Sequence, residues 1–264
     1  MADSEEIRRD TPQPADQSAL IPMMAEDVSR ARRRKQIWIA AVLLVVVGVA
    51  WNLYHHAVDP VDARLSYGDG VRLFRANRYE QAILNFNQAI DLQPNYVDAY
   101  RMRGRAYAAL SKPDDAVPDF TKVVNYRPKD ATALVERGFA ELDRKKLDRA
   151  LADAVAALAI EPQFARAYNL RATAERAMGD LPKAIEDFTH AAEIDPNLDN
   201  LFQRGATYQA MNDQQHALAD FDAALVLAPD QPHTYFARAQ ARIALGDMKG
   251  AKEDIEYGRK IDGW

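Results

Sequence analysis

The feature that most constrains this chain is a set of alanines that recur about every 34 residues. They are Ala82, Ala116, Ala150, Ala184, Ala217 and Ala251, at spacings of 34, 34, 34, 33 and 34 residues. Prolines follow the same frame with the same one-residue deletion, at Pro94, Pro128, Pro162, Pro196 and Pro229. A fixed period of this length is typical of a solenoid, in which each repeat is one supersecondary unit packed against its neighbours.

Two further sets of equivalent positions, called columns here, indicate the secondary structure of each repeat. Twelve residues before each column alanine is a small residue, in the order Gly70, Gly104, Gly138, Ala172, Gly205 and Ala239. Four residues after it stand Phe86, Phe120, Ala154, Phe188, Phe221 and Ile255. Offsets of three and four residues place column members on one helix face, and each proline ends the second helix. We therefore predict six hairpins of two antiparallel helices.

This period, with its glycine, alanine, phenylalanine and proline columns, resembles the tetratricopeptide repeat family. The resemblance covers residues 63–264 in six repeats, namely 63–96, 97–130, 131–164, 165–197, 198–231 and 232–264. It implies an all-α fold in which the repeats form a right-handed α-solenoid of six helix-turn-helix units. Two departures are local: Pro118 should distort its helix, and Ala154 leaves the third repeat without its aromatic filler.

The segment before the repeats predicts a single membrane-spanning helix over residues 37–54, followed by a linker over 55–62. Of those 18 residues, 17 are apolar or glycine, and aromatic side chains stand near both ends. Eighteen helical residues reach about 27 Å, close to the thickness of about 30 Å of a bilayer's hydrocarbon core. Two alternatives stay open, a buried core helix and a cleavable signal peptide, although the leader of 36 residues is long for such a signal.

Charge predicts the orientation of this anchor. Five basic residues, Arg30, Arg32, Arg33, Arg34 and Lys35, precede the span, whereas Arg64 is the only one within about 15 residues after it. Basic residues are retained in the cytoplasm, so we expect the repeats in the periplasm of a bacterial inner-membrane protein. Residues 1–36 contain three prolines and no sustained apolar period, and we predict that they are a disordered cytoplasmic tail ending in the basic cluster.

Repeats two to six share an arginine and an aspartate at fixed places. The arginines are Arg103, Arg137, Arg171, Arg204 and Arg238, and the aspartates are Asp119, Asp153, Asp187, Asp220 and Asp254. The first repeat lacks both and has Asp69 and Asn85 instead. Because both are lost together, we predict an ion pair between the two helices of each repeat. The alternative is a charged ladder for ligands.

The family resemblance implies that the first helix of each repeat lines a concave groove, which takes an extended peptide or a partner's helix. The expected groove residues are Arg64, Tyr67, Phe74, Arg75, Arg101, Arg105, Phe139, Asn169, Arg176, Phe202, Gln209, Phe236 and Gln240. Arginine and aromatic residues are enriched at interaction hot spots. The family's clamp for acidic chaperone tails is not matched, because Arg105 and Glu136 stand where asparagines are expected.

The composition of the chain argues against several classes of function. The net charge is −5, there is no cysteine, and the five histidines show no ligand spacing. Together with the lack of a phosphate-binding loop, this predicts no enzyme activity, cofactor, metal, nucleic acid or small-molecule substrate. We predict a membrane-tethered protein–protein interaction scaffold, chaperone-like, that assembles or stabilises envelope proteins. The alternatives are a receptor or co-chaperone with cytosolic repeats, and a self-associating structural element, because the last repeat lacks a polar capping helix and ends on Trp264.

Overall fold

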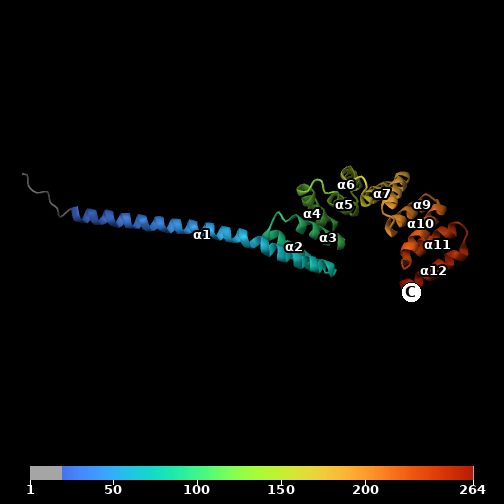
Figure 1. Cartoon of the computed structure of the whole chain (residues 1–264), viewed down its shortest axis with the longest axis horizontal. Coiled ribbons are helices and arrows are strands. Elements are labelled where there is room, and N and C mark those ends of the chain that lie inside the picture. The colour runs from blue at the N-terminus through green and yellow to red at the C-terminus, as the bar shows by residue number, and fades with distance from the viewer. Residues whose placement is uncertain (1–19, 264) are drawn as a thin grey trace, which may run out of the picture. The chain divides into compact units, whose positions relative to one another are not determined.

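The computed structural model describes residues 20–263, with side chains described from 32 to 51 and from 60 to 263. The chain divides into two compact units, 1–59 and 60–264. The described residues form twelve helices and no strand (Figure 1). The prediction of an all-α fold is therefore confirmed.

Helix α1 (Leu20–Arg75) runs through the boundary between the two units. The remaining helices are α2 (Tyr79–Leu92), α3 (Val97–Ala109), α4 (Pro113–Tyr126), α5 (Ala131–Asp143), α6 (Leu147–Ile160), α7 (Ala165–Met178), α8 (Leu181–Ile194), α9 (Leu198–Ala210), α10 (Gln214–Leu227), α11 (Pro232–Ala244) and α12 (Met248–Asp262).

The first unit contains one helical segment, Arg32–Trp51, that is long and apolar enough to cross a membrane by length and composition. None of this segment is buried against the rest of the protein; Trp38 and Leu44, for example, are more than 70 % exposed. A helix that buries no apolar face in protein differs from the core helix of a soluble domain. This exposure favours a membrane-spanning helix over a buried core helix.

The flanks of this segment differ from the sequence-based expectation. Helix α1 begins at Leu20, so residues 20–36 of the expected disordered tail are helical, while residues 1–19 lie outside the described part. Pro22 is compatible with this start because the first N–H groups of a helix have no partner within it. The linker expected over 55–62 is also helical, with Pro60 inside α1 next to the unit boundary.

The second unit is a solenoid of six helix pairs, as predicted. The end of α1 pairs with α2, where Tyr67 and Gly70 lie against Phe86. The later pairs are α3/α4, α5/α6, α7/α8, α9/α10 and α11/α12, each packed on the next (Figure 1). Within every pair the turn contains one residue of positive φ, namely Asn77, Ser111, Lys145, Gly179, Asn212 or Gly246. A left-handed residue at the end of the first helix reverses the chain within a short turn.

The small column and the aromatic column meet inside each hairpin. Phe86, Phe120 and Phe221 are almost fully buried, and a Cβ added to Gly104 would lie 2.9 Å from the Phe120 ring. Glycine is therefore required where the ring lies on the backbone of the first helix.

In the third repeat, a residue of the next repeat takes the place of the missing aromatic side chain. Ala154 leaves space beside Gly138, and Leu170 of α7 fills it, so that a Cβ on Gly138 would overlap the leucine side chain. Leu170 is fully buried. The third and fourth repeats thus share a core that the sequence columns alone do not predict.

The structure answers two expectations about irregular positions, the proline inside α4 and the end of the last repeat. Helix α4 continues through Pro118, whose side chain is exposed, so the proline does not end the helix. At the other end, α12 exposes charged residues such as Lys252 and Glu256, and its exposed large apolar residues are Met248 and Tyr257. The apolar end surface expected for the last repeat is therefore not found on α12, and Trp264 lies outside the described residues.

Candidate functional site

The repeated arginines and aspartates form the predicted ion pairs inside repeats two to six. In each, the arginine Nε and Nη2 donate to the two carboxylate oxygens, and the Nη2 to Oδ1 distances lie between 2.5 and 2.7 Å. The five aspartates are buried. The hydrogen bonds to Asp153 raise the pKa of the Arg137 guanidinium, although burial opposes this. Because each arginine forms two hydrogen bonds with the aspartate of its own hairpin, these residues hold the hairpin together and are not a ladder for ligands. Arg103 and Arg238 also donate to Asn87 and Asp222 of the preceding repeat.

The expected basic groove of the second repeat is neutralised by the protein itself. Arg105 Nε donates to Glu136 Oε1 at 2.6 Å, and Arg101 Nε lies 3.4 Å from Glu136 Oε2. Arg101 also donates to Asp130, the residue that caps α5. Although burial favours the neutral acid, the hydrogen bonds from Arg101 and the Ala133 N–H hold the pKa of Asp130 below its ordinary value. These two arginines therefore connect the second repeat to the third.

The polar groove residues of the later repeats connect neighbours in the same way. Asn169 Nδ2 donates to Asn200 Oδ1 at 2.8 Å, and Arg176 Nη2 donates to Gln203 Oε1 at 2.8 Å. Burial lowers the pKa of Arg176. Gln209 Nε2 donates to the Ala237 carbonyl oxygen at 3.1 Å. These expected ligand contacts thus bind one repeat to the next.

The aromatic groove residues are half-buried between helices. Tyr67 packs on Tyr96 and Phe86, and Phe74 meets the Tyr79 ring edge-on, with centroids 5.2 Å apart. In the later repeats, the Phe202 ring lies 4.9 Å from that of His233, and Phe236 packs against Gly258. Each of these rings is partly exposed and stabilises the packing of neighbouring helices.

A hollow of about 450 Å³ lies on the first-helix face, over repeats three to five. It is lined by Phe139, Arg166, Asn169, Asp195, Asn197, Asp199 and Asn200. The Arg166 guanidinium lies 5.9 Å from the Phe139 ring, and Arg166 and Asp199 are exposed. With Asp195, which is also exposed, the hollow therefore presents a cation, two carboxylates and an aromatic ring together, a mixture suited to a polar peptide with an apolar anchor.

The sequence prediction and this hollow share Phe139 and Asn169. Of the other expected groove residues, Arg64, Arg75 and Gln240 are exposed and lie outside the hollow. The sequence analysis missed Arg166 and Asp199. These stand at the second position of repeats four and five, the position that Arg64 occupies in the first repeat, and that common position was the available signal.

Among the described residues, no group of three or more histidine, cysteine, aspartate or glutamate side chains could hold a metal ion.

Comparison with known families agrees with this architecture. A model described as TPR repeat matches residues 70–111, and two described as tetratricopeptide repeat match residues 101–161 and 165–198. The chain is a tetratricopeptide repeat protein. No curated protein sequence matches it.

Solved structures of other tetratricopeptide repeat proteins share the fold. The thermophilic protein TTC0263 of Thermus thermophilus is 21 % identical, with a TM-score of 0.58 over 69 % of this chain and 98 % of that one. PilW, described as a widely conserved type IV pilus biogenesis factor, is 17 % identical, with a TM-score of 0.69 over 75 % and 92 %. PilF of Pseudomonas aeruginosa is 14 % identical, with a TM-score of 0.65 over 77 % and 93 %. At these identities the likeness concerns the fold alone.

Proposed function

We propose that this protein is a non-catalytic scaffold, tethered to the bacterial inner membrane, whose repeats bind protein partners in the periplasm. It would assemble or stabilise envelope proteins, in the manner of a chaperone-like adaptor. Tetratricopeptide repeats are interaction modules, and a linear array of them offers an extended surface for an extended partner.

The observation that carries this proposal is the hollow on the first-helix face. Phe139, Arg166, Asp195, Asn197 and Asp199 line it and are open to solvent, at least in part. The other polar residues of this face are largely engaged between repeats. A partner segment with one apolar side chain and one carboxylate would match the Phe139 ring and the Arg166 guanidinium.

Two observations support the membrane tether and its orientation. The segment Arg32–Trp51 is long and apolar enough to span a bilayer, and basic residues cluster at its N-terminal end, over residues 30–35. The structural neighbours include PilW and PilF, and the former is described as a pilus biogenesis factor. A periplasmic array beside an envelope machine is consistent with that similarity of fold.

Protease access tests the topology. An antibody against the last repeats is used on intact cells, on cells with a permeabilised outer membrane, and on lysate. We expect digestion once the outer membrane is permeable, with the full-length chain in the membrane fraction before digestion. Repeats that stay protected until lysis would place them in the cytoplasm and refute the periplasmic scaffold.

Photo-crosslinking tests the hollow itself. A benzophenone amino acid replaces Arg166 at the rim of the hollow, and a control chain carries it in place of the exposed Lys252 on α12. We expect discrete adducts from position 166 and none of the same mass from position 252. The same adduct pattern from both positions would show that the hollow is not the binding surface.

A further inference from the structure

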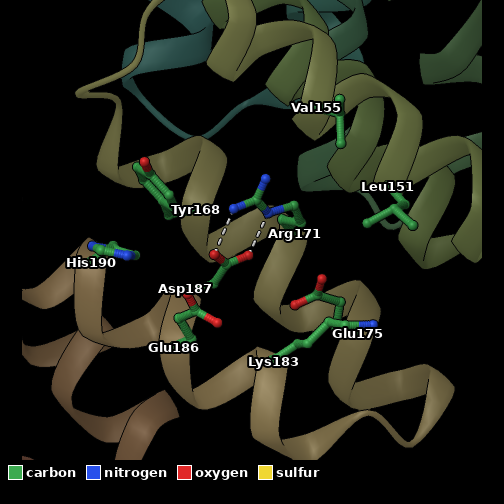
Figure 2. Close-up of a pocket in the computed structure, with 9 residues that line it drawn as sticks. All are labelled: Leu151, Val155, Tyr168, Arg171, Glu175, Lys183, Glu186, Asp187 and His190. Atoms are coloured by element: carbon green, nitrogen blue, oxygen red, sulfur yellow. Dashed lines mark hydrogen bonds and ion pairs between the residues drawn. The ribbon is translucent and has the colours of Figure 1, made fainter.

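A second hollow of about 430 Å³ lies away from the groove residues, between α6, α7 and α8 (Figure 2). Leu151 and Val155 of α6 form an apolar wall, and Tyr168, Glu175 and Glu186 add an aromatic ring and two carboxylates. The ion pair of Arg171 with Asp187 lies within it, as the dashed lines in Figure 2 show.

The charges in this hollow do not balance. Arg171 is used by Asp187, and Lys183 Nζ is held by Asp180 Oδ2 at 2.6 Å. Among the described residues, Glu175 and Glu186 have no ion pair, and Glu175 Oε2 is buried without a hydrogen-bond partner. A buried carboxylate oxygen that lacks a donor is costly, so the site favours a cationic donor. Burial also raises the pKa of Glu175, which agrees with a carboxylate that lacks a partner.

The preceding repeat shows how the protein satisfies the same position. Glu141, 34 residues before Glu175, pairs with Arg144 at 3.1 Å and with Arg149 at 3.3 Å. In the fourth repeat, methionine and lysine stand at the places of these two arginines, as Met178 and Lys183.

The lysine of the fourth repeat is also turned to another partner. Asp180 stands where the third repeat has Lys146, and it pairs with Lys183. The fourth repeat therefore forms neither of the two ion pairs that neutralise this carboxylate one repeat earlier.

The wall of the hollow continues into an exposed face without charge. Ala152, Val155, Ala156 and Ala159 of α6 are exposed and share one helix face. The following second helix, α8, exposes Glu186 on the corresponding face. A partner helix could pack closely on the small residues of α6, and the stem of a long side chain could lie along Val155.

We propose that this hollow binds an arginine or lysine side chain of a partner protein, presented by a helix whose apolar face packs on α6. The cation would satisfy Glu175 and Glu186, and its aliphatic stem would lie on Leu151 and Val155. This site lies apart from the first-helix hollow, so the protein has two binding surfaces of different chemistry.

The test uses the full chain in detergent micelles and two fluorescent helical peptides. Both carry alanine and leucine on one face and glutamine on the other; one has a central arginine and its twin has citrulline, which is neutral and nearly isosteric. We expect the arginine peptide to bind about tenfold more tightly, the value of one charge-assisted hydrogen bond. Glu175→Gln with Glu186→Gln should abolish this difference, and Val155→Gln should weaken both peptides.

A matched control separates this site from general attraction to an acidic protein. Glu80→Gln with Glu161→Gln changes the net charge equally at two exposed positions outside the hollow and should preserve the tenfold preference. Equal affinity for the two peptides, including no measurable binding of either, would overturn the proposal. A control variant that also loses the preference would overturn it too.

Discussion

The ion pair of the third repeat allows a direct measurement of what holds each hairpin together. Arg137 Nε and Nη2 donate to the Asp153 oxygens at 2.9 and 2.6 Å. The Asp153 side chain is 8 % exposed and that of Arg137 is 22 % exposed, so solvent screens the pair only weakly. A single loss of the arginine therefore leaves a buried carboxylate without its counter-ion.

We expect Arg137→Met to reduce the free energy of unfolding by about 3 kcal/mol, since breaking one side of a buried pair typically costs about 3–5 kcal/mol. The double variant Arg137→Met with Asp153→Leu removes the stranded charge and should be more stable than Arg137→Met alone. The control is Lys252→Ala, which breaks an exposed pair with Glu256 at 3.7 Å. That loss should stay below about 1 kcal/mol.

The assay is urea unfolding of the full chain in detergent, followed by far-ultraviolet circular dichroism. Repeat arrays can unfold in stages, so amide hydrogen exchange should be measured on α5 and α6 in parallel. We expect faster exchange in these two helices in Arg137→Met and slower exchange again in the double variant. A loss below about 1 kcal/mol for Arg137→Met, or a double variant no more stable than the single one, would refute the reasoning.

Three further predictions concern packing, pH and capping. Leu170→Ala should cost about 2–5 kcal/mol in unfolding free energy, and adding Ala154→Phe should recover part of it, because the ring then fills the space beside the first helix. The lowered pKa of Asp130 in the folded state means that its contribution is complete above the unfolded value of about 4 and lost below it. Asp130→Asn should therefore flatten the fall of the urea midpoint below about pH 4, and an unchanged slope would contradict the role of Arg101. Asn197→Ala removes the cap of α9 and should cost about 1 kcal/mol in the same measurement.

Most of the solenoid could be predicted from the sequence because its determinants repeat. Gly70, Gly104 and Gly205 each lie against a phenylalanine at the same distance along the chain. Arg103 and Asp119 are separated by that same distance. Such contacts stay inside one hairpin, so the spacing of two residues is enough to place them together. The Arg–Asp pairing was predictable in addition because the first repeat lacks both partners.

The groove was harder to predict because its side chains reach across repeats. The position of Arg101 on the first helix was expected from the period, but its engagement by Asp130 and Glu136 depends on how one hairpin packs on the next. The same holds for Leu170, which fills a space left by Ala154 in a different repeat. The repeat pattern shows at which helix position a side chain stands. It does not show which residue of the neighbouring repeat pairs with that side chain or packs against it.

The positions at which one repeat differs from the others indicate where this protein binds its partners. The residues that the repeats share stabilise the fold, since each repeated arginine of repeats two to six is paired with the aspartate of its own repeat. The open groups instead occur where one repeat differs from its neighbour, as Glu175 does when Met178 replaces an arginine. Phe139 is another such case, because the equivalent position of the repeat before it holds Arg105. The two hollows therefore share the third and fourth repeats, and substitutions of their open groups, such as Phe139 and Glu175, should alter binding without unfolding the array.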